Sequence, residues 1–239
     1  MMLVVAQGPV IPQFERASSC VRENKQFCFD WVVDNFGRVF APQLVEHIEL
    51  TLLAVGIGFV FAFGAALLAY SLDWFETPFA IFAAFLYTIP SLAFFQLMVP
   101  ITGLSRTSAE IALVSYTILI LFRNTLTGLR EVPEDARMAA RAMGLTKGQI
   151  LRRVELPLAL PAIMAGIRIA TVTTISLATV AAFIGVGGLG QPIFNAIQSG
   201  FKTQFVAAGI LAVGLALVAD ALLVFLQRLL APWLRAERA

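Results

Sequence analysis

Two charged residues stand inside long apolar stretches of the chain, Arg168 and Asp220. Each lies ten residues from one end of its stretch, Arg168 after Leu158 and Asp220 before Leu230. At about 1.5 Å per residue, both would lie roughly 15 Å deep if these stretches are helices. A charge at that depth is costly unless it is paired or reaches water. We therefore expect an ion pair between them; the alternative is that Arg168 lines a polar path beside Thr171.

Other residue types that carry catalysis or bind metals are sparse. The single histidine, His47, lies between Glu46 and Glu49 before an apolar stretch, and fits an interfacial residue better than a ligand or base. Cys20 and Cys28 have no neighbouring Cys or His to complete a zinc site. They form a disulfide if this region faces an oxidising compartment, or remain free thiols. With no Ser-His-Asp set and no intramembrane carboxylate pair, we expect no enzyme, no metal site and no cofactor in this chain.

A glycine-rich segment, Gly185-Val-Gly187-Gly188-Leu-Gly190, matches the G-x-G-x-x-G pattern of dinucleotide-binding proteins. That pattern is informative only between a strand and a helix, with an acidic residue about 20 positions later. Here it follows an apolar stretch and no such acidic residue is present. The segment is therefore interpreted as a tight turn at the end of that stretch.

Pro90 falls inside another apolar stretch and should interrupt its helix. A helix broken at mid-membrane depth can line a cavity. The neighbouring Tyr87, Thr88, Ser91 and Phe94 are therefore, with Pro90, candidates for a translocation path. The alternative is a packing kink that touches no solute.

The elements that must position these residues are membrane-spanning helices. The 239-residue chain is 59% hydrophobic and only 13% charged, far more apolar than an ordinary soluble domain. Its net charge of +2 gives no basis for nucleic-acid binding. Apolar stretches near the roughly 20 residues needed to cross a bilayer predict an all-α polytopic membrane protein. The expected five spans are about 49–72, 78–101, 109–122, 158–183 and 206–230.

Orientation follows from the distribution of basic residues, which favour the cytoplasmic side. The polar segment 123–157 is rich in them and should be a cytoplasmic loop, with the tail 231–239 on the same side. Five spans then place the region 1–48 outside the cytoplasm. The basic residues of the loop are Arg123, Arg130, Arg137, Arg141, Lys147, Arg152 and Arg153.

Within this loop, local signals predict two short helices. Pro133 suits a helix start, Gly144 can end a helix in the left-handed conformation, and Thr146 with Gln149 matches a capping box. The first helix should place its small apolar residues on one face, which suits insertion into a groove on a partner protein. The alternative is an amphipathic helix lying on the membrane. The residues of that face are Ala136, Ala139, Ala140 and Met143.

The loop resembles the EAA signature of ABC-importer permeases, which reads Glu-Ala-Ala, three residues, Gly, nine residues, Ile-x-Leu-Pro. Ala139, Ala140, Gly144, Leu156 and Pro157 fall at its positions, with Val154 in place of Ile and Met138 in place of Glu. The resemblance implies a type I ABC importer permease fold, in which this loop is a coupling helix docked on an ATPase subunit. The implied coupling residues are Ala136, Ala139, Ala140, Met143, Gly144 and Leu145.

The resemblance also implies the partners. A second permease chain would complete the pore, ATPase subunits would bind the ATP and magnesium, and an extracytoplasmic binding protein would deliver the solute. The setting would be a prokaryotic cell membrane.

Several further segments resemble the osmoprotectant branch of these permeases, whose members import glycine betaine, carnitine or choline. They are TIPSLAFF (88–95), LFRNTLTGL (121–129), VELPLALPAIMAGIRIA (154–170) and LATVAAFIGVGGLGQPIF (177–194). A quaternary-ammonium osmoprotectant is thus the expected cargo. The alternatives are an amino acid or another small polar solute carried by the same machine, and an ATP-independent channel or secondary transporter.

Overall fold

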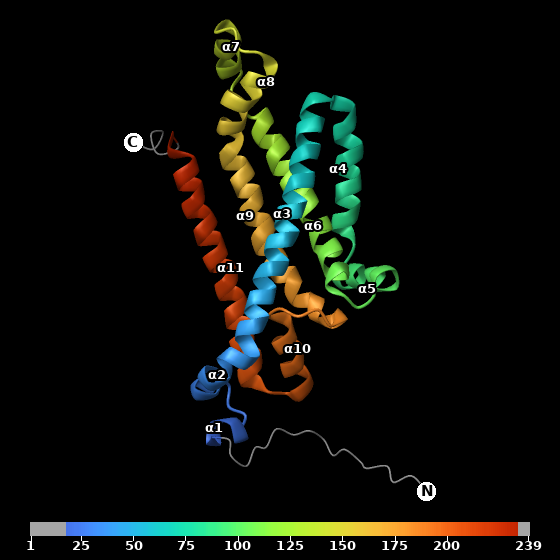
Figure 1. Ribbon diagram of the computed structural model, residues 1–239, viewed down its shortest axis with the longest axis vertical. Coiled ribbons are helices and arrows are strands. Elements are labelled where there is room, and N and C mark those ends of the chain that lie inside the picture. Colours follow the sequence, from blue (N-terminus) through green and yellow to red (C-terminus); the bar gives the residue numbers. More distant parts are fainter. Residues whose placement is uncertain (1–17, 234–239) are drawn as a thin grey trace.

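The computed structural model describes residues 18–233, which form helices joined by short turns (Figure 1). No strand occurs within that range. The helices are α1 Ser19–Arg22, α2 Phe29–Asn35, α3 Ala41–Ser71, α4 Asp73–Thr88, α5 Ser91–Thr102, α6 Arg106–Arg130, α7 Glu134–Ala142, α8 Lys147–Ile150, α9 Leu156–Val180, α10 Gly190–Ser199 and α11 Lys202–Leu230. In this part of the chain, four helical stretches are long and apolar enough to cross a membrane, and a bent pair makes up to five. The predicted all-α polytopic architecture with about five spans is confirmed.

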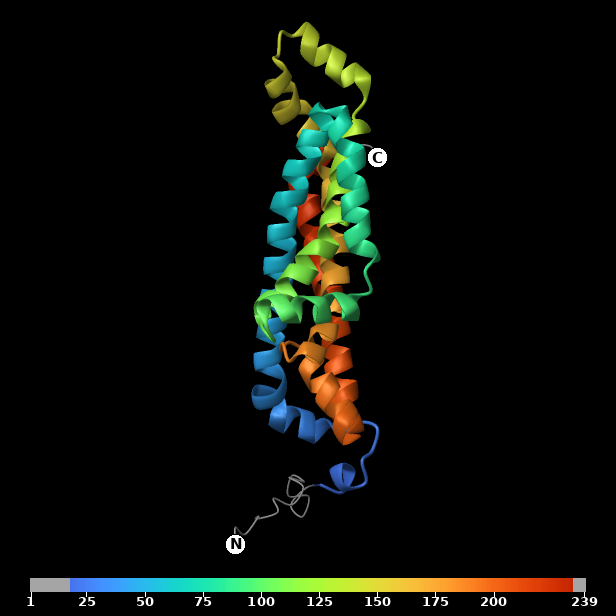
Figure 2. The same cartoon turned by 90° about the vertical axis from the view of Figure 1, so that its right-hand side faces the viewer.

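The molecule is an elongated bundle with different elements at its two ends (Figures 1 and 2). Helices α7 and α8 project from one end, whereas α1, α2 and α10 lie at the other. Helices α3, α6 and α11 run toward the α7–α8 end, and α4 and α9 run away from it. The last turn of α11 therefore lies on the same side of the bundle as α7.

Small side chains allow α3, α6 and α9 to pack closely at the centre. Ala54, Ala62 and Ala66 of α3 are fully buried, and Gly58 lies between them. A Cβ on Gly58 would come within 1.8 Å of Thr117 Oγ1 on α6, so only glycine permits this approach. Helices in lipid associate through such close van der Waals contact, because lipid supplies no hydrophobic driving force between them.

Helix α11 is attached differently, since it packs mainly on α9 and α10 at the edge of the bundle. Only Thr203, Ala207 and Ala208, all near its start, are buried. Large apolar side chains cover its outward face, as expected for a surface that meets lipid or another subunit.

The helices extend beyond several predicted spans. The first span, 49–72, coincides with the later part of a helical stretch that runs from Phe29 to Ser71 through a π-helical turn, Phe36–Phe40. Helix α6 covers 25 residues, far more than the predicted 109–122, so the polar loop begins at Glu131. The arginines at its two ends pair with neighbouring helices, Arg106 with Glu49 and Arg130 with Glu76.

Three other regions also differ from the expected outline. The span predicted at 78–101 is two helices, α4 and α5, which meet at 96° around Pro90. The span predicted at 158–183 belongs to a helical stretch from Lys147 to Ile184. Helix α10 has no predicted counterpart, and the predicted tail 231–239 lies mostly outside the described residues.

Candidate functional site

The projecting loop has the two-helix form expected from its sequence. Pro133 directly precedes α7, and Glu134 and Asp135 occupy the first turn, where they favour the positive end of the helix dipole. Gly144 takes the left-handed conformation, with φ of 78°, and reverses the chain. The backbone N–H of Thr146 then donates to Gln149 Oε1 at 2.8 Å, at the start of α8. Local capping signals therefore determine this loop.

The outward surface of α7 differs from the expected apolar face. Ala140 is only 1% exposed and turns toward the rest of the chain, whereas Met143 is 71% exposed. Met138, where the signature has Glu, is 52% exposed, and Ala139 is also exposed. Ala136 is half-buried, so the expected face is divided between the two sides of the helix. Next to it, Gly144 is exposed and Leu145 is half-buried.

Arg137 fastens the inner side of α7 to the bundle. Its Nε donates to Glu155 Oε1 at 2.9 Å, and its terminal nitrogens donate to the Leu129 carbonyl at 2.7 Å and to Glu134 at 3.2 Å. Tyr70 donates its hydroxyl to the same Glu155 oxygen at 2.7 Å. Burial alone would lower the pKa of the Arg137 guanidinium, but its hydrogen bonds to Glu134 and Glu155 raise it above its ordinary value. Arg137 therefore stays charged.

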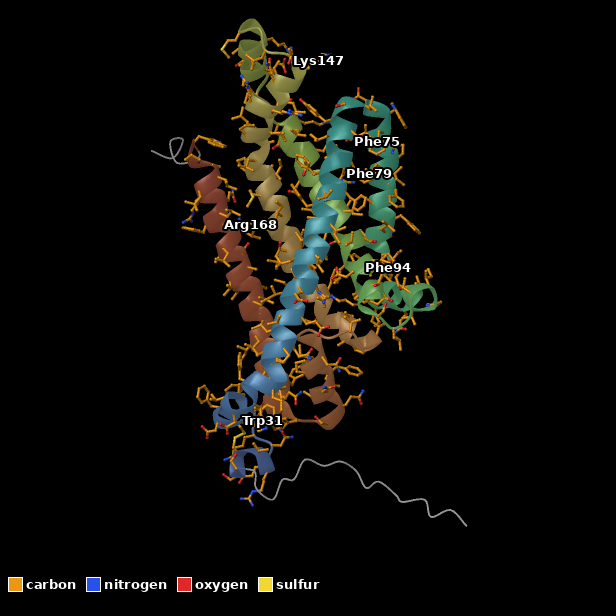
Figure 3. The ribbon with its side chains drawn as sticks, viewed as in Figure 1. Trp31, Phe75, Phe79, Phe94, Lys147 and Arg168 are labelled. Carbon is orange, nitrogen blue, oxygen red and sulfur yellow. A yellow bond between two sulfur atoms is a disulfide. The ribbon has the colours of Figure 1, made fainter. Side chains whose placement is uncertain are left out.

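Arg168 and Asp220 meet between α9 and α11 (Figure 3). Arg168 Nε donates to one carboxylate oxygen at 2.8 Å, and the terminal nitrogen donates to the other at 3.0 Å. Both side chains are about one-third exposed, at 33% and 36%, in an open groove of about 510 Å³. Thr171 does not line that groove, because it is buried and donates to the Ile167 carbonyl. The geometry thus favours the pair over an unpaired Arg168 beside Thr171.

The bend between α4 and α5 gathers aromatic side chains around Tyr116 of α6. The rings of Tyr87 and Phe94 lie 5.9 and 5.8 Å from that of Tyr116, whose hydroxyl donates to the Ile89 carbonyl at the break. Tyr87 is exposed, whereas Phe94 is buried at the bend (Figure 3).

The polar residues of the bend lie at its surface. Thr88 and Pro90 are exposed and Ser91 is half-buried. In this conformation Tyr87, Thr88 and Pro90 lie at the surface of the chain, and Phe94 does not.

His47, interpreted from the sequence as an interfacial residue, is fully buried inside the protein. Nδ1 accepts from the Leu189 N–H at 3.1 Å, so that nitrogen carries no proton, and Nε2 donates to the Ile175 carbonyl at 3.0 Å. The adjacent Glu46 accepts from the Gly188 N–H at 3.3 Å. The histidine thus holds the glycine-rich turn against α3.

A sequence signal for this role existed. His47 lies four and seven residues before Thr51 and Ala54, on the same helical face as the small residues that pack against α6.

A disulfide joins Cys20 and Cys28 at the end of the bundle opposite α7. The loop that it closes contacts the turn between α10 and α11: Asn24 donates to the Gly200 carbonyl at 2.9 Å. The Cys28 N–H donates to Thr203 Oγ1 at 3.1 Å. The bridge therefore holds the region before α2 against α11. Within residues 18–233, no group of His, Cys, Asp and Glu is arranged to hold a metal ion.

Comparison with known proteins identifies the family to which the chain belongs. A family model described as "Binding-protein-dependent transport system inner membrane component" matches residues 54–236. The osmoprotectant import permease protein OsmW of Salmonella typhimurium is 38% identical over 207 residues, which cover 84% of this chain and 96% of that protein. The choline transport system permease protein OpuBB of Bacillus subtilis is 36% identical over 188 residues, covering 78% and 86%.

The fold agrees with this family. A chain from the inward-facing MetNI methionine ABC transporter superimposes with a TM-score of 0.71 at 22% identity, covering 82% of this chain and 98% of that one.

Proposed function

Because the chain belongs to the family of binding-protein-dependent transport system inner membrane components, we propose that it is the permease subunit of an ATP-driven importer for a quaternary-ammonium osmoprotectant. The observation that carries the proposal is the α7–α8 loop. It projects beyond the bundle, turns at Gly144, which is the glycine of the EAA signature, and exposes apolar side chains.

An ATPase partner is the proposed occupant of the outward face of α7. Met138 and Met143 are exposed there on either side of Ala139, and their flexible thioethers can fill an irregular apolar groove. The partner binds the ATP and magnesium, and this chain contributes binding and movement. Ala140 supports the helix from within.

The α7–α8 end is the cytoplasmic end in this proposal, and the N-terminal region lies outside. Basic residues concentrate in the loop, in accord with the excess of Lys and Arg on the cytoplasmic side of membrane proteins. The Cys20–Cys28 bridge lies at the opposite end, where an oxidising compartment would preserve it.

The solute path is proposed to run past the bend between α4 and α5, completed by a second permease chain. Tyr87, Thr88 and Pro90 are exposed there, and an aromatic face attracts a quaternary ammonium group. A separate extracytoplasmic binding protein would deliver the solute. The choice of cargo rests on the relatives named for osmoprotectants and choline; an amino acid is the second candidate.

The decisive experiment is a mild-detergent purification of the tagged chain from its native membrane, followed by identification of its partners by mass spectrometry. We expect an ATPase subunit with the wild-type chain and much less with Gly144→Asp, because the substitution places a strained, charged residue in the exposed turn. Gly103→Asp is the matched control, since Gly103 also has a positive φ, of 76°, but lies between α5 and α6. It should retain the ATPase.

Recovery of no ATPase with the wild-type chain would contradict the importer and favour an ATP-independent transporter. Equal recovery with Gly144→Asp would contradict docking through this loop. The purified complex, reconstituted with its binding protein, should then accumulate labelled glycine betaine in competition with choline and carnitine. Competition by amino acids alone would move the cargo to the second candidate.

A further inference from the structure

Helix α7 has few contacts with the helices that it would have to move. It packs on α8 and on the π-helical turn Leu151–Glu155, and Ala140 is its one buried residue. Arg137 is the exception, because its side chain is only 14% exposed and bonds both to Glu155, where that turn joins α9, and to the Leu129 carbonyl of α6. The hydrogen bonds of Arg137 thus connect α7 directly with the spanning helices.

The hydrogen bonds of Arg137 reach the ends of two spanning helices, and its partner Glu155 reaches the end of a third. Leu129, whose carbonyl accepts from Arg137, is the second-last residue of α6. Glu155, which accepts from Arg137 Nε, directly precedes α9. The same Glu155 oxygen accepts from Tyr70, the second-last residue of α3. One guanidinium therefore links α7 with α6 and α9 directly, and with α3 through one shared carboxylate.

The surroundings make this linkage stiff. Leu129, Val132, Ala159 and Ile163 form a buried apolar cluster against which Tyr70 packs. Charge-assisted hydrogen bonds strengthen in such a low-dielectric setting, and a broken one leaves a buried charge without a partner. The planar fork of arginine can make the Nε and terminal bonds together, which a lysine ammonium cannot reproduce.

We propose that Arg137 is the positioning residue that carries a displacement of α7 to α3, α6 and α9 as a unit. The inference rests on the proposed function, since an ATPase must move α7. Arg141 provides the contrast on the same helix: its side chain is 62% exposed, and it pairs with Glu134, which lies on α7 itself. The Arg141 ion pair therefore lies entirely within α7 and does not connect this helix with the spanning helices.

The test follows the displacement by hydrogen–deuterium exchange in the purified complex with its ATPase, with and without MgATP and vanadate. In the wild-type chain, nucleotide trapping should change exchange at 67–71, 127–130 and 156–159. In Arg137→Gln the changes at these three segments should be lost, so that the response to nucleotide is confined to α7 and α8, while vanadate-sensitive ATP hydrolysis continues. The exchange changes in Arg137→Lys should lie between those of the wild type and Arg137→Gln, and those in Arg141→Gln should match the wild type.

Tyr70→Phe isolates one branch of the linkage, because it removes only the hydroxyl that α3 contributes. The response at 67–71 should disappear while those at the ends of α6 and α9 remain. Wild-type responses at all three ends in Arg137→Gln would overturn the proposal. If Arg137→Gln proves globally unfolded, an undiminished response of α3 in Tyr70→Phe overturns it instead. Failure of the wild-type chain to retain an ATPase would contradict the proposed function itself, and this result is distinguishable from both exchange outcomes above.

Discussion

Arg168 and Asp220 illustrate how two costly residues become compatible with a membrane interior. The guanidinium and the carboxylate meet through two parallel hydrogen bonds, the geometry that arginine favours with a carboxylate. Among residues 18–233, neither side chain has another hydrogen-bond or ion-pair partner, so each depends on the other for neutralisation within a mostly apolar groove. The pair also joins α11, a helix with little buried surface of its own, to α9.

Asp220→Ala should therefore lower the thermal stability of the purified chain and its level in the membrane, because it leaves Arg168 without a counter-charge. Arg168→Met combined with Asp220→Leu should be less harmful than Asp220→Ala alone, since the double variant leaves no unpaired charge. Thermal unfolding in detergent and quantitative membrane blots measure both effects. A single variant as stable and abundant as the wild type would show that the pair has no structural role.

At the scale of elements, the glycine-rich segment is held by α3. The His47 ring bonds to the backbone of two segments, the body of α9 at Ile175 and the turn at Leu189. A Cβ on Gly188 would lie 2.9 Å from His47 Nδ1, so the close approach of the turn to this ring requires glycine. Val186, in the same glycine-rich segment, belongs to the buried apolar cluster that contains Phe94. This cluster connects the glycine-rich segment with the bend between α4 and α5.

His47→Leu should destabilise the half of the bundle that lies away from α7, because it leaves the Leu189 N–H and the Ile175 carbonyl unpaired, at about 1–3 kcal/mol for each group. His47→Gln is the matched variant, since its amide can both accept and donate, and it should lose less. Thermal unfolding and local hydrogen exchange at 181–190 report the difference. Equal loss in both variants would mean that ring packing, and not hydrogen bonding, holds the turn.

At the scale of the whole molecule, the two ends differ in chemistry as well as shape. The Cys20–Cys28 bridge fastens the N-terminal region to the α10–α11 turn at one end, and the basic loop occupies the other. A bundle placed across a membrane with the loop in the cytoplasm puts the bridge outside. The arrangement therefore makes a joint prediction about topology and redox state.

When the chain is purified from native membranes and denatured without reductant, its two native cysteines should give no free thiol; after reduction they should give two. A thiol introduced at the opposite end by Met143→Cys should remain free and react with an impermeant reagent only in inside-out vesicles. Two free native thiols, or labelling of the introduced thiol in intact cells, would contradict the proposed orientation.

The sequence by itself determined the features that depend on local chemistry. Long apolar stretches required membrane helices, Pro90 required a break, and Gly144 with the Thr146–Gln149 cap defined the α7–α8 turn. The meeting of Arg168 and Asp220 could also be anticipated, because both depths are counted from the same end of the bundle.

Only the tertiary structure decided which helix faces meet. The bend of 96° that turns α5 aside, the inward rotation of Ala140, and the exposure of Met138 depend on how the assembled helices pack. The same holds for His47, whose partner Leu189 lies 142 residues away, and for Arg137 with Tyr70 and Glu155. The physical reason is that a helix pattern fixes which residues share a face, whereas the partner of that face is chosen by the close packing of the whole bundle.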